Sequence, residues 1–273
     1  MILIGESINS SIKRVREAVE ARDGEYLKRL ALAQQENGAA YVDVNCGTRV
    51  KDEVETMDWM VRTVASAVRI PLSIDSPRPE AVEAGLLAAG RPGTLINSIT
   101  AEKERMEALI PLAVRHEAKV IALLMDDQGI PETVEDRVRI AGTLIPALMD
   151  AGIPADHILV DSIVKPIGTG DGAGLEVLDS IRAIREKYPE VHFTAGLSNI
   201  SHGLPGDAEI NHAFLILCIR EGLDHCIANV LDRRITAYSA AAEALLGKDP
   251  WCARLLKSFR AGYFSEKQNY LDL

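Results

Sequence analysis

The sequence predicts a single-domain (β/α)8 TIM barrel, and three observations lead to that fold. Short apolar runs alternate with longer amphipathic stretches, which is the pattern of buried parallel strands joined by helices. The 273-residue chain holds eight such strand-plus-helix units, and a barrel of this class takes about 250 residues. Seven of the apolar runs end on Asp or Asn, a poor choice for core packing but a suitable one where strand ends converge on a pocket.

The eight units follow one another without a linker rich in Pro, Gly or Ser, so we expect a single domain over residues 1–273 with the barrel over about residues 1–247. A doubly wound open sheet is the alternative, but no G-x-G-x-x-G follows the first strand. Residues 248–273 are expected to add helix outside the barrel or at a subunit contact. The expected strands cover residues 2–5, 41–45, 72–75, 94–97, 119–125, 158–160, 192–196 and 226–230.

Local signals place several of the helix ends. Gly38 closes a helix over 24–37 at its C-terminal cap. Pro79 fits the first turn of a helix over 79–89, and Thr133 with Asp136 forms a capping box at the start of another. Each of these helices follows one strand and leads to the next. The other expected helices cover residues 54–68, 102–116, 133–151, 175–187, 208–221 and 234–246.

Composition argues against several classes of protein. A formal net charge of −10 and 4% aromatic residues do not suit a nucleic-acid surface. No apolar stretch approaches a membrane span, and the N-terminus meets polar residues too soon for a signal peptide. The four cysteines lack a C-x-x-C pair, which predicts a cytoplasmic protein with reduced, mostly buried thiols. The six histidines show no mutual spacing, so each is expected to be a surface or core residue.

The strand ends predict a pocket rich in carboxylates and amides, because the active site of such a barrel lies at the C-terminal ends of its strands. That composition suits a neutral ligand with N–H donors, such as an aminopyrimidinone ring, since one carboxylate accepts two parallel N–H bonds. A local turn role is the alternative for any single Asp or Asn. The same acids suit a hard cation, but none forms a D-x-D or H-x-H pair, so we expect no metal. The residues concerned are Glu6, Asp43, Asn45, Asp75, Asn97, Asp126, Asp161, Asn199 and Asn229.

Longer runs around these positions resemble the pterin-binding methyltransferases. This family contains the methyltetrahydrofolate:corrinoid protein methyltransferases and the folate module of cobalamin-dependent methionine synthase, within a superfamily that includes dihydropteroate synthase. The resemblance extends in order from about residue 1 to about residue 247, and the spacing is most similar to the stand-alone enzymes. The matching runs are Ile4-Gly-Glu-Ser-Ile-Asn9, Val42-Asp-Val-Asn-Cys-Gly47, Ser73-Ile-Asp-Ser76, Ile96-Asn-Ser98 and Gly196-Leu-Ser-Asn-Ile-Ser201.

The resemblance implies roles for individual residues. Asp75, Asn97 and Asp161 match residues that hydrogen-bond the pterin ring, and Asn199 matches the catalytic residue that approaches N5 of the folate. His202, three residues past Asn199, is a candidate substrate contact. Relatives carry a basic residue in the loop where this chain has Asp207, which leaves open how the p-aminobenzoyl-glutamate tail or the corrinoid partner is contacted. The remaining pocket positions are Glu6, Asp43, Asn45, Met125, Ser198 and Ile227.

The chemistry implied by this resemblance is methyl transfer between N5 of tetrahydrofolate and a corrinoid cobalt. A donor such as Asn199 at N5 would stabilise the leaving amine as the C–N bond breaks. The cobalamin motif D-x-H-x-x-G does not occur, so 5-methyltetrahydrofolate or tetrahydrofolate would meet a corrinoid on a separate partner protein. A homodimer is expected from the family. The alternatives are a dihydropteroate synthase-like condensing enzyme, although the S-R-K and R-x-H segments of that enzyme are missing, and a pterin-binding protein without turnover.

Overall fold

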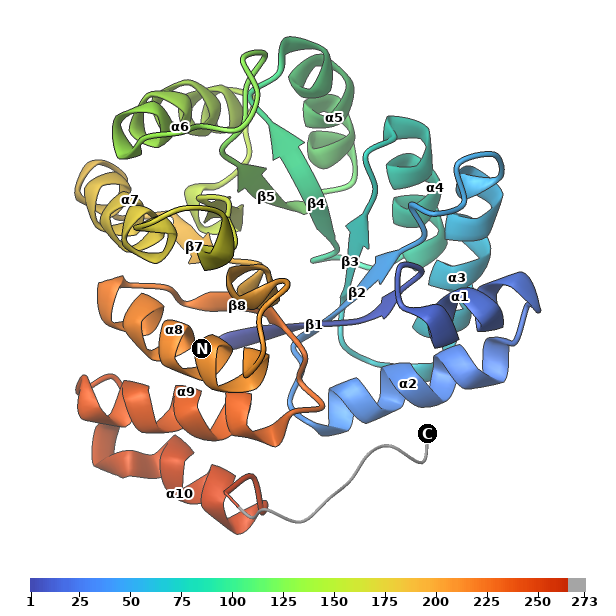
Figure 1. The fold of residues 1–273 in the computed structure, drawn as a ribbon. Helices are drawn as coiled ribbons and strands as arrows, with labels where there is room; N and C mark the ends of the chain where they lie inside the picture. Colours follow the sequence, from blue (N-terminus) through green and yellow to red (C-terminus); the bar gives the residue numbers. More distant parts are fainter. Residues whose placement is uncertain (265–273) are drawn as a thin grey trace.

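The computed structural model describes residues 1–264 and shows eight parallel strands arranged as a barrel with helices around it (Figure 1). The strands are ordered β7-β6-β5-β4-β3-β2-β1-β8. A parallel bridge between Gly196 and Ile227 joins the two ends of this order and nearly closes the barrel. The predicted fold class is therefore confirmed. The strands are β1 Ile2–Asn9, β2 Tyr41–Asn45, β3 Leu72–Asp75, β4 Leu95–Thr100, β5 Lys119–Leu123, β6 Ile158–Asp161, β7 His192–Thr194 and β8 His225–Ala228.

One helix follows each strand, as the sequence predicts, and two more are added to this repeat. The helix α10 packs on α9 outside the barrel, which confirms extra helix in the C-terminal stretch; the part of that prediction that concerns residues 265–273 lies outside the described chain. Within residues 1–264, no helix is long and apolar enough to span a membrane. The helices are α1 Lys13–Glu20, α2 Gly24–Glu36, α3 Glu53–Ala67, α4 Pro79–Ala89, α5 Lys103–Arg115, α6 Val134–Asp150, α7 Ala173–Lys187, α8 Asp207–Glu221, α9 Arg233–Leu245 and α10 Ala253–Arg260.

The first connection differs from the prediction, because β1 runs to Asn9 and α1 follows it where a loop was expected. This helix has eight residues, five of them charged, and it buries only Val15, Ala18 and Val19. A stretch of eight residues is shorter than the window in which helical periodicity is recognised in a sequence. Its stability comes from packing against the neighbouring elements rather than from its own propensity.

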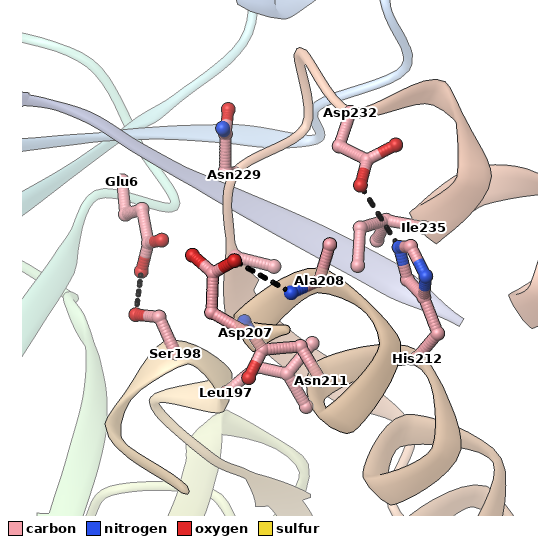
Figure 2. A pocket seen from close by; sticks show the side chains of 11 residues that line it. Glu6, Leu197, Ser198, Asp207, Ala208, Asn211, His212, Asn229, Asp232 and Ile235 are labelled. Carbon is pink, nitrogen blue, oxygen red and sulfur yellow. Dashed lines mark hydrogen bonds and ion pairs between the residues drawn. The ribbon is translucent and has the colours of Figure 1, made fainter. Parts of the chain in front are cut away.

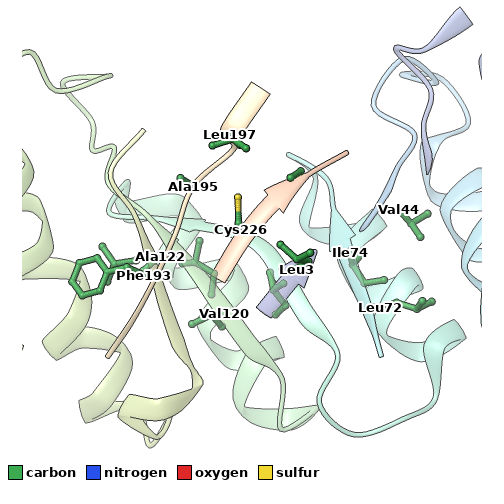
Figure 3. Packing of buried hydrophobic residues seen from close by; sticks show 14 of the residues in the cluster. Leu3, Val44, Leu72, Ile74, Val120, Ala122, Phe193, Ala195, Leu197 and Cys226 are labelled. Carbon is green, nitrogen blue, oxygen red and sulfur yellow. The ribbon is translucent and has the colours of Figure 1, made fainter. Parts of the chain in front are cut away.

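Two hydrophobic cores hold the barrel. The larger lies between the strands and the surrounding helices, and Figure 3 shows part of it, including Leu72, Ile74, Phe193 and Cys226. A smaller cluster, with members from six strands, fills the barrel interior below the mouth. Its members are Ile4, Tyr41, Leu95, Ile121 and Leu159, with the partly buried Ile227 against them.

The interior cluster explains where the polar side chains point. Successive side chains of a strand face opposite sides, so a residue two positions after an interior residue also faces the interior. Each such residue lies one step closer to the C-terminal end, directly above the apolar layer. The sequence therefore directs a set of acids and amides into the mouth of the barrel. They are Glu6 after Ile4, Asp43 after Tyr41, Asn97 after Leu95 and Asp161 after Leu159.

Candidate active site

Three adjacent strands carry polar side chains at the same level of the mouth. The strand register pairs Asn45 with Asp75 and Asp75 with Asn97. Asn45 Nδ2 donates to Asp75 Oδ2 at 2.8 Å, and Asn97 Nδ2 donates to Asp43 Oδ1 at 3.1 Å. The two amides therefore hold the two carboxylates in place, while each carboxylate keeps further acceptor capacity for a ligand.

Burial makes these carboxylates weaker acids. The pKa of Asp75 rises to about 6, chiefly because the group is desolvated, and Asn45 opposes this by donating to it. Burial, with the nearby Asp75 charge, raises the pKa of Asp43 well above its usual range. Burial also raises the pKa of Glu6. Several acids with raised pKa values at one end of a barrel are typical of a functional site.

Asp161 enters the mouth from β6, across the barrel from β2 and β3. Its side chain is 6% exposed, and Oδ1 accepts from the backbone N–H of Ile163 at 2.8 Å. Burial raises the pKa of Asp161 to about 6, although the N–H groups of Ile163 and Gly196 act in the opposite direction. Its charge is thus held by backbone dipoles, without a cationic partner among these influences.

Asn199 lies in a short 3-10 helix, Leu197–Ser201, that follows β7. Leu197, Ile200 and Ser201 are buried and anchor this turn against the barrel. The Asn199 amide lies close to the backbone of Gly196: a Cβ added to Gly196 would be 2.9 Å from Asn199 Nδ2. The Asn199 amide therefore occupies space that a side chain at position 196 would need. The backbone N–H of Gly196 also donates to Asp161.

Glu6 and Ser198 line a pocket whose other residues come from β8 and the starts of α8 and α9 (Figure 2). Ser198 Oγ donates to Glu6 Oε2 at 3.2 Å, which links β1 to the residue before Asn199. The pocket has a volume of about 190 Å³ and lies between the ends of β1 and β8 and the N-termini of α8 and α9.

The other predicted positions are spread more widely. Ile227 lies on β8 against the interior cluster, at the floor of the mouth. Met125 lies just past β5, with its carbonyl accepting from Ala101 N–H at 2.7 Å. His202 is exposed at the end of the 3-10 turn. These placements leave their proposed contacts with substrate as predictions.

The local turn role that was the alternative interpretation is found for Asn45 and Asp161 beside their other contacts, and it is also found for Asp126 and Asn229. Asp126 Oδ1 accepts from Gln128 N–H at 3.0 Å, and its other oxygen pairs with Arg139 at 2.8 Å. Asn229 Oδ1 accepts from Leu231 N–H at 3.1 Å. Both side chains therefore stabilise loops at the mouth.

Sequence reasoning missed a cation near the acids. Arg105, in the first turns of α5, donates from Nη2 to the carbonyl of Ser98 at 2.6 Å and also to that of Pro77. Its charge acts to lower the pKa of Asp75, and partial burial lowers its own pKa. The sequence could have indicated this, because Arg105 lies in the first turn of the helix that follows β4, the strand that carries Asn97.

Two of the histidines have a structural role together, which their spacing in the sequence does not indicate. His192 and His225 begin the adjacent strands β7 and β8, and both Nδ1 atoms bond to Asp224, at 2.9 and 2.8 Å. This cluster lies at the opposite end of the barrel from the mouth, where residues serve stability rather than catalysis.

The thiols fit the prediction. Cys46, Cys218 and Cys226 are buried and Cys252 is exposed, and none of the four forms a disulfide. Burial, reinforced by the charges of Glu53, Asp52 and Asp75, raises the pKa of Cys46 to about 12. Cys46 is therefore protonated at neutral pH and is not a nucleophile.

Comparison with known proteins agrees with this geometry. The family model described as "Pterin binding enzyme" matches residues 9–229. The methylcorrinoid:tetrahydrofolate methyltransferase of Eubacterium limosum is 36% identical over 264 residues, which cover 96% of this chain and 97% of that protein. The methionine synthase of Mycobacterium leprae is 32% identical over 242 residues, 84% of this chain but only 20% of that longer protein.

Solved structures of lower sequence identity share the fold. A dihydropteroate synthase of Xanthomonas albilineans superposes with a TM-score of 0.67 at 21% identity, over 90% of this chain and 92% of that one. The enzyme of Stenotrophomonas maltophilia gives a TM-score of 0.64 at 19% identity, over 90% and 91% of the two chains. At this level of identity the likeness shows the barrel fold alone.

Proposed function

We propose, from the premise that this chain belongs to the pterin binding enzyme family, that it is a methyltransferase acting between N5 of tetrahydrofolate and a corrinoid. The observation that carries this proposal is the similarity, over almost the whole of both chains, to the Eubacterium limosum methyltransferase. The name of that relative gives methylcorrinoid first and tetrahydrofolate second. We propose that the methyl group moves in this direction here, from the corrinoid to tetrahydrofolate.

The pterin ring is proposed to lie between the strand ends of β3, β4 and β6. Its N–H groups would donate to the Asp75 and Asp161 carboxylates, and Asn97 would present its amide to the ring edge. A buried carboxylate without a cationic partner gains most from such donors, because charge-assisted hydrogen bonds replace the lost hydration. The raised pKa of Asp161, which only backbone N–H groups oppose, is the electrostatic sign of this unmet demand, and the pKa of Asp75 stays raised in spite of the nearby charge of Arg105.

Asn199 is proposed as the catalytic residue. When methyl leaves the folate, the C–N5 bond breaks, its electron pair stays on N5, and N5 gains a proton. An amide N–H directed at N5 stabilises the charge that develops there and needs no tuned pKa. The same donor assists the reverse direction, because both directions pass through one transition state. The corrinoid supplies the cobalt that exchanges the methyl group.

The corrinoid is proposed to arrive on a separate protein that docks over the mouth. A homodimer in the cytoplasm also belongs to this proposal. We place the dimer contact on the α9–α10 side, where Leu245 is 87% and Trp251 95% exposed. Apolar side chains exposed to this extent favour association, because a partner that covers them removes them from water. Light scattering on the eluting protein tests the dimer.

Calorimetry and one substitution test the function. Wild-type protein should bind tetrahydrofolate and 5-methyltetrahydrofolate with micromolar affinity. Asn199→Ala should slow methyl transfer roughly 10- to 1000-fold, the loss expected for one transition-state donor, while pterin affinity changes little. An unchanged rate would remove Asn199 from the mechanism. A wild type that binds neither folate would refute the proposal as a whole.

A further inference from the structure

A buried carboxylate, that of Glu53, lies beside the mouth and has no part in the methyl transfer proposed above. Glu53 is the first residue of α3 and is 2% exposed. The preceding Asp52 pairs with Arg49 at 2.5 Å, whereas Glu53 Oε1 accepts from the Ser76 hydroxyl at 2.6 Å. A buried charge whose partner is a neutral hydroxyl costs free energy, so packing alone does not account for a glutamate at this position.

Ser76 connects Glu53 to the polar strand ends. It follows Asp75 directly, and its backbone N–H donates to the carbonyl of Asn97 at 3.2 Å. Its Oγ donates to Glu53 and accepts from Arg78 N–H at 3.0 Å, so the hydroxyl is used both as a donor and as an acceptor. The Ser76 hydroxyl therefore fixes the turn after β3, between the two residues Asp75 and Asn97 that are proposed to bind the pterin.

Glu53 is also linked to the end of the neighbouring strand β2. Cys46 Sγ donates to the backbone carbonyl of Glu53 at 3.6 Å. Cys46 follows Asn45, the residue whose amide donates to Asp75. The start of α3 thus contacts two adjacent strand ends, that of β2 through Cys46 and that of β3 through Ser76.

The charge of Glu53 acts on Asp75 as well. Burial is the largest cause of the raised pKa of Asp75, and the Glu53 charge raises that pKa further. The hydrogen bonds of Asn45 and Asp43 and the charge of Arg105 oppose the increase. Glu53 and Arg105 therefore act on Asp75 with opposite signs. The titratable and charged groups around Asp75 are Asp43 from β2, Cys46 from the turn after it, Glu53 from α3 and Arg105 from α5, while Glu6 and Glu102 act on Asp43 and on Arg105.

We propose that Glu53 is a positioning residue of the pterin site, which acts on Asp75 both through the Ser76 hydroxyl and through its own charge. The inference rests on the proposed function, because it takes Asp75 as a residue that binds the pterin. An ionised Asp75 accepts the N–H donors of the ring most strongly, and a like charge nearby disfavours that ionised form. Glu53 therefore weakens pterin binding at low pH, where Asp75 takes up a proton, while Ser76 keeps the carboxylate in its binding geometry at every pH.

Two substitutions separate the hydrogen bond from the charge. Glu53→Gln keeps an acceptor for Ser76 and removes the charge, whereas Ser76→Ala keeps the charge and removes the hydroxyl. Calorimetric titration with 5-methyltetrahydrofolate between about pH 5.5 and pH 8 compares both variants with wild type.

The two variants should differ from wild type in different ways. Near the low end of this pH range, Glu53→Gln should bind the folate about 3- to 10-fold more tightly than wild type, the effect of one nearby charge at intermediate dielectric. The difference should shrink towards the high end, where Asp75 is ionised in both proteins. Ser76→Ala should bind about 3- to 10-fold more weakly at every pH, the cost of ordering one side chain on binding.

Glu55→Gln is the matched control, because it makes the same charge change on the same helix with a side chain that is 79% exposed. It should follow wild type at every pH. Urea unfolding of each variant confirms that the protein is folded under the conditions of the titration. Carbon-13 NMR of labelled aspartate carboxyl groups follows Asp75 in the free protein, with its signal assigned by Asp75→Asn. The midpoint of the Asp75 titration should be lower in Glu53→Gln than in wild type or Glu55→Gln.

The possible failures are distinguishable. An Asp75 midpoint or a pH profile of affinity that is the same in Glu53→Gln as in wild type would overturn the role of Glu53. Unchanged affinity in Ser76→Ala would overturn it as well. Both results leave the proposed function intact, because wild type still binds the folate in these experiments. A wild type that binds no folate would instead refute the proposed function, whatever the Asp75 midpoint does.

Discussion

Asp161→Asn should make the free protein more stable at neutral pH while it weakens pterin binding. The Asp161 carboxylate is almost fully buried. Burial raises its pKa, backbone N–H groups lower it, and burial has the larger effect. Asparagine has nearly the same shape and stays neutral at every pH. The substitution therefore isolates the free energy of holding a charge in the mouth of the barrel.

The magnitude follows from the pKa. Burial raises the pKa of Asp161 from 3.8 to about 6, and each unit corresponds to about 1.4 kcal/mol, so the charged form lowers stability by about 3 kcal/mol. Because the folded-state pKa lies above the unfolded value, the stability of wild type is highest below about pH 4. It is lost progressively as the pH rises through about 6. The advantage of the variant should thus be near zero at pH 4 and approach about 3 kcal/mol at pH 7.5.

Urea unfolding at pH 4.5, 5.5, 6.5 and 7.5 measures this difference, and Asp150→Asn on the surface is the control for a general charge effect. Calorimetry at pH 7.5 should show that pterin affinity falls by about 1.5–3 kcal/mol, the value of a hydrogen bond to a charged group. Equal free energies of unfolding for wild type and variant at every pH would refute the electrostatic reasoning. Unchanged pterin affinity would remove Asp161 from the binding site.

Two further substitutions test one position beside the catalytic amide and one position in the cluster at the far end of the barrel. Gly196→Ala places a Cβ 2.9 Å from Asn199 Nδ2 and should lower kcat with little change in pterin affinity. The control, Gly170→Ala, meets nothing within 4 Å and should leave kcat unchanged. Equal kcat values for the two variants would contradict the role of Gly196 in positioning the Asn199 amide. Asp224→Asn removes a carboxylate that bonds to two histidines and to Phe193 N–H. It should lower the free energy of unfolding, measured in urea at pH 7, by roughly 1.5–3 kcal/mol. Hydrogen bonds from His192 and His225 hold the pKa of Asp224 below its usual range in spite of burial. Its contribution to the free energy of unfolding should therefore persist as the pH falls to about 4. Loss of the stability difference between wild type and variant above pH 5 would count against this reasoning.

The helices that the sequence predicts best are those with explicit end signals. Pro79 occupies the first position of α4 and Gly90 ends it in the left-handed conformation at a φ of 56°, so Pro79–Ala89 is predicted to the residue. By contrast, α1 has no side-chain cap and a short apolar face, and its existence depends on tertiary contacts. Strand ends drift by a few residues, as at β4, because hydrogen bonding to a neighbouring strand decides where a strand stops.

The strand-end acids were predictable because the fold itself determines their direction. Once Ile4 or Leu159 is in the interior, the residue two positions later must face the mouth. Residues that reach the site from loops and helices follow no such periodicity. Arg105 arrives from α5, and the space beside Gly196 depends on how one 3-10 turn folds back. The Asp224 cluster depends on which two strands meet where the barrel closes, a fact of topology that no local pattern records.

The acids of the mouth and those of the adjoining pocket fulfil different requirements with the same residue type. Asp75 and Asp161 are buried carboxylates with raised pKa values, so they gain from a ligand that brings N–H donors to them. Asp207 and Asp232 instead bond to the backbone at the N-termini of α8 and α9. Asp232 is also paired with Arg234 and bonded to His212. The acids of the mouth are therefore the ones that gain from a donor-rich ring, whereas the acids at the two helix N-termini stabilise the helices that follow β7 and β8.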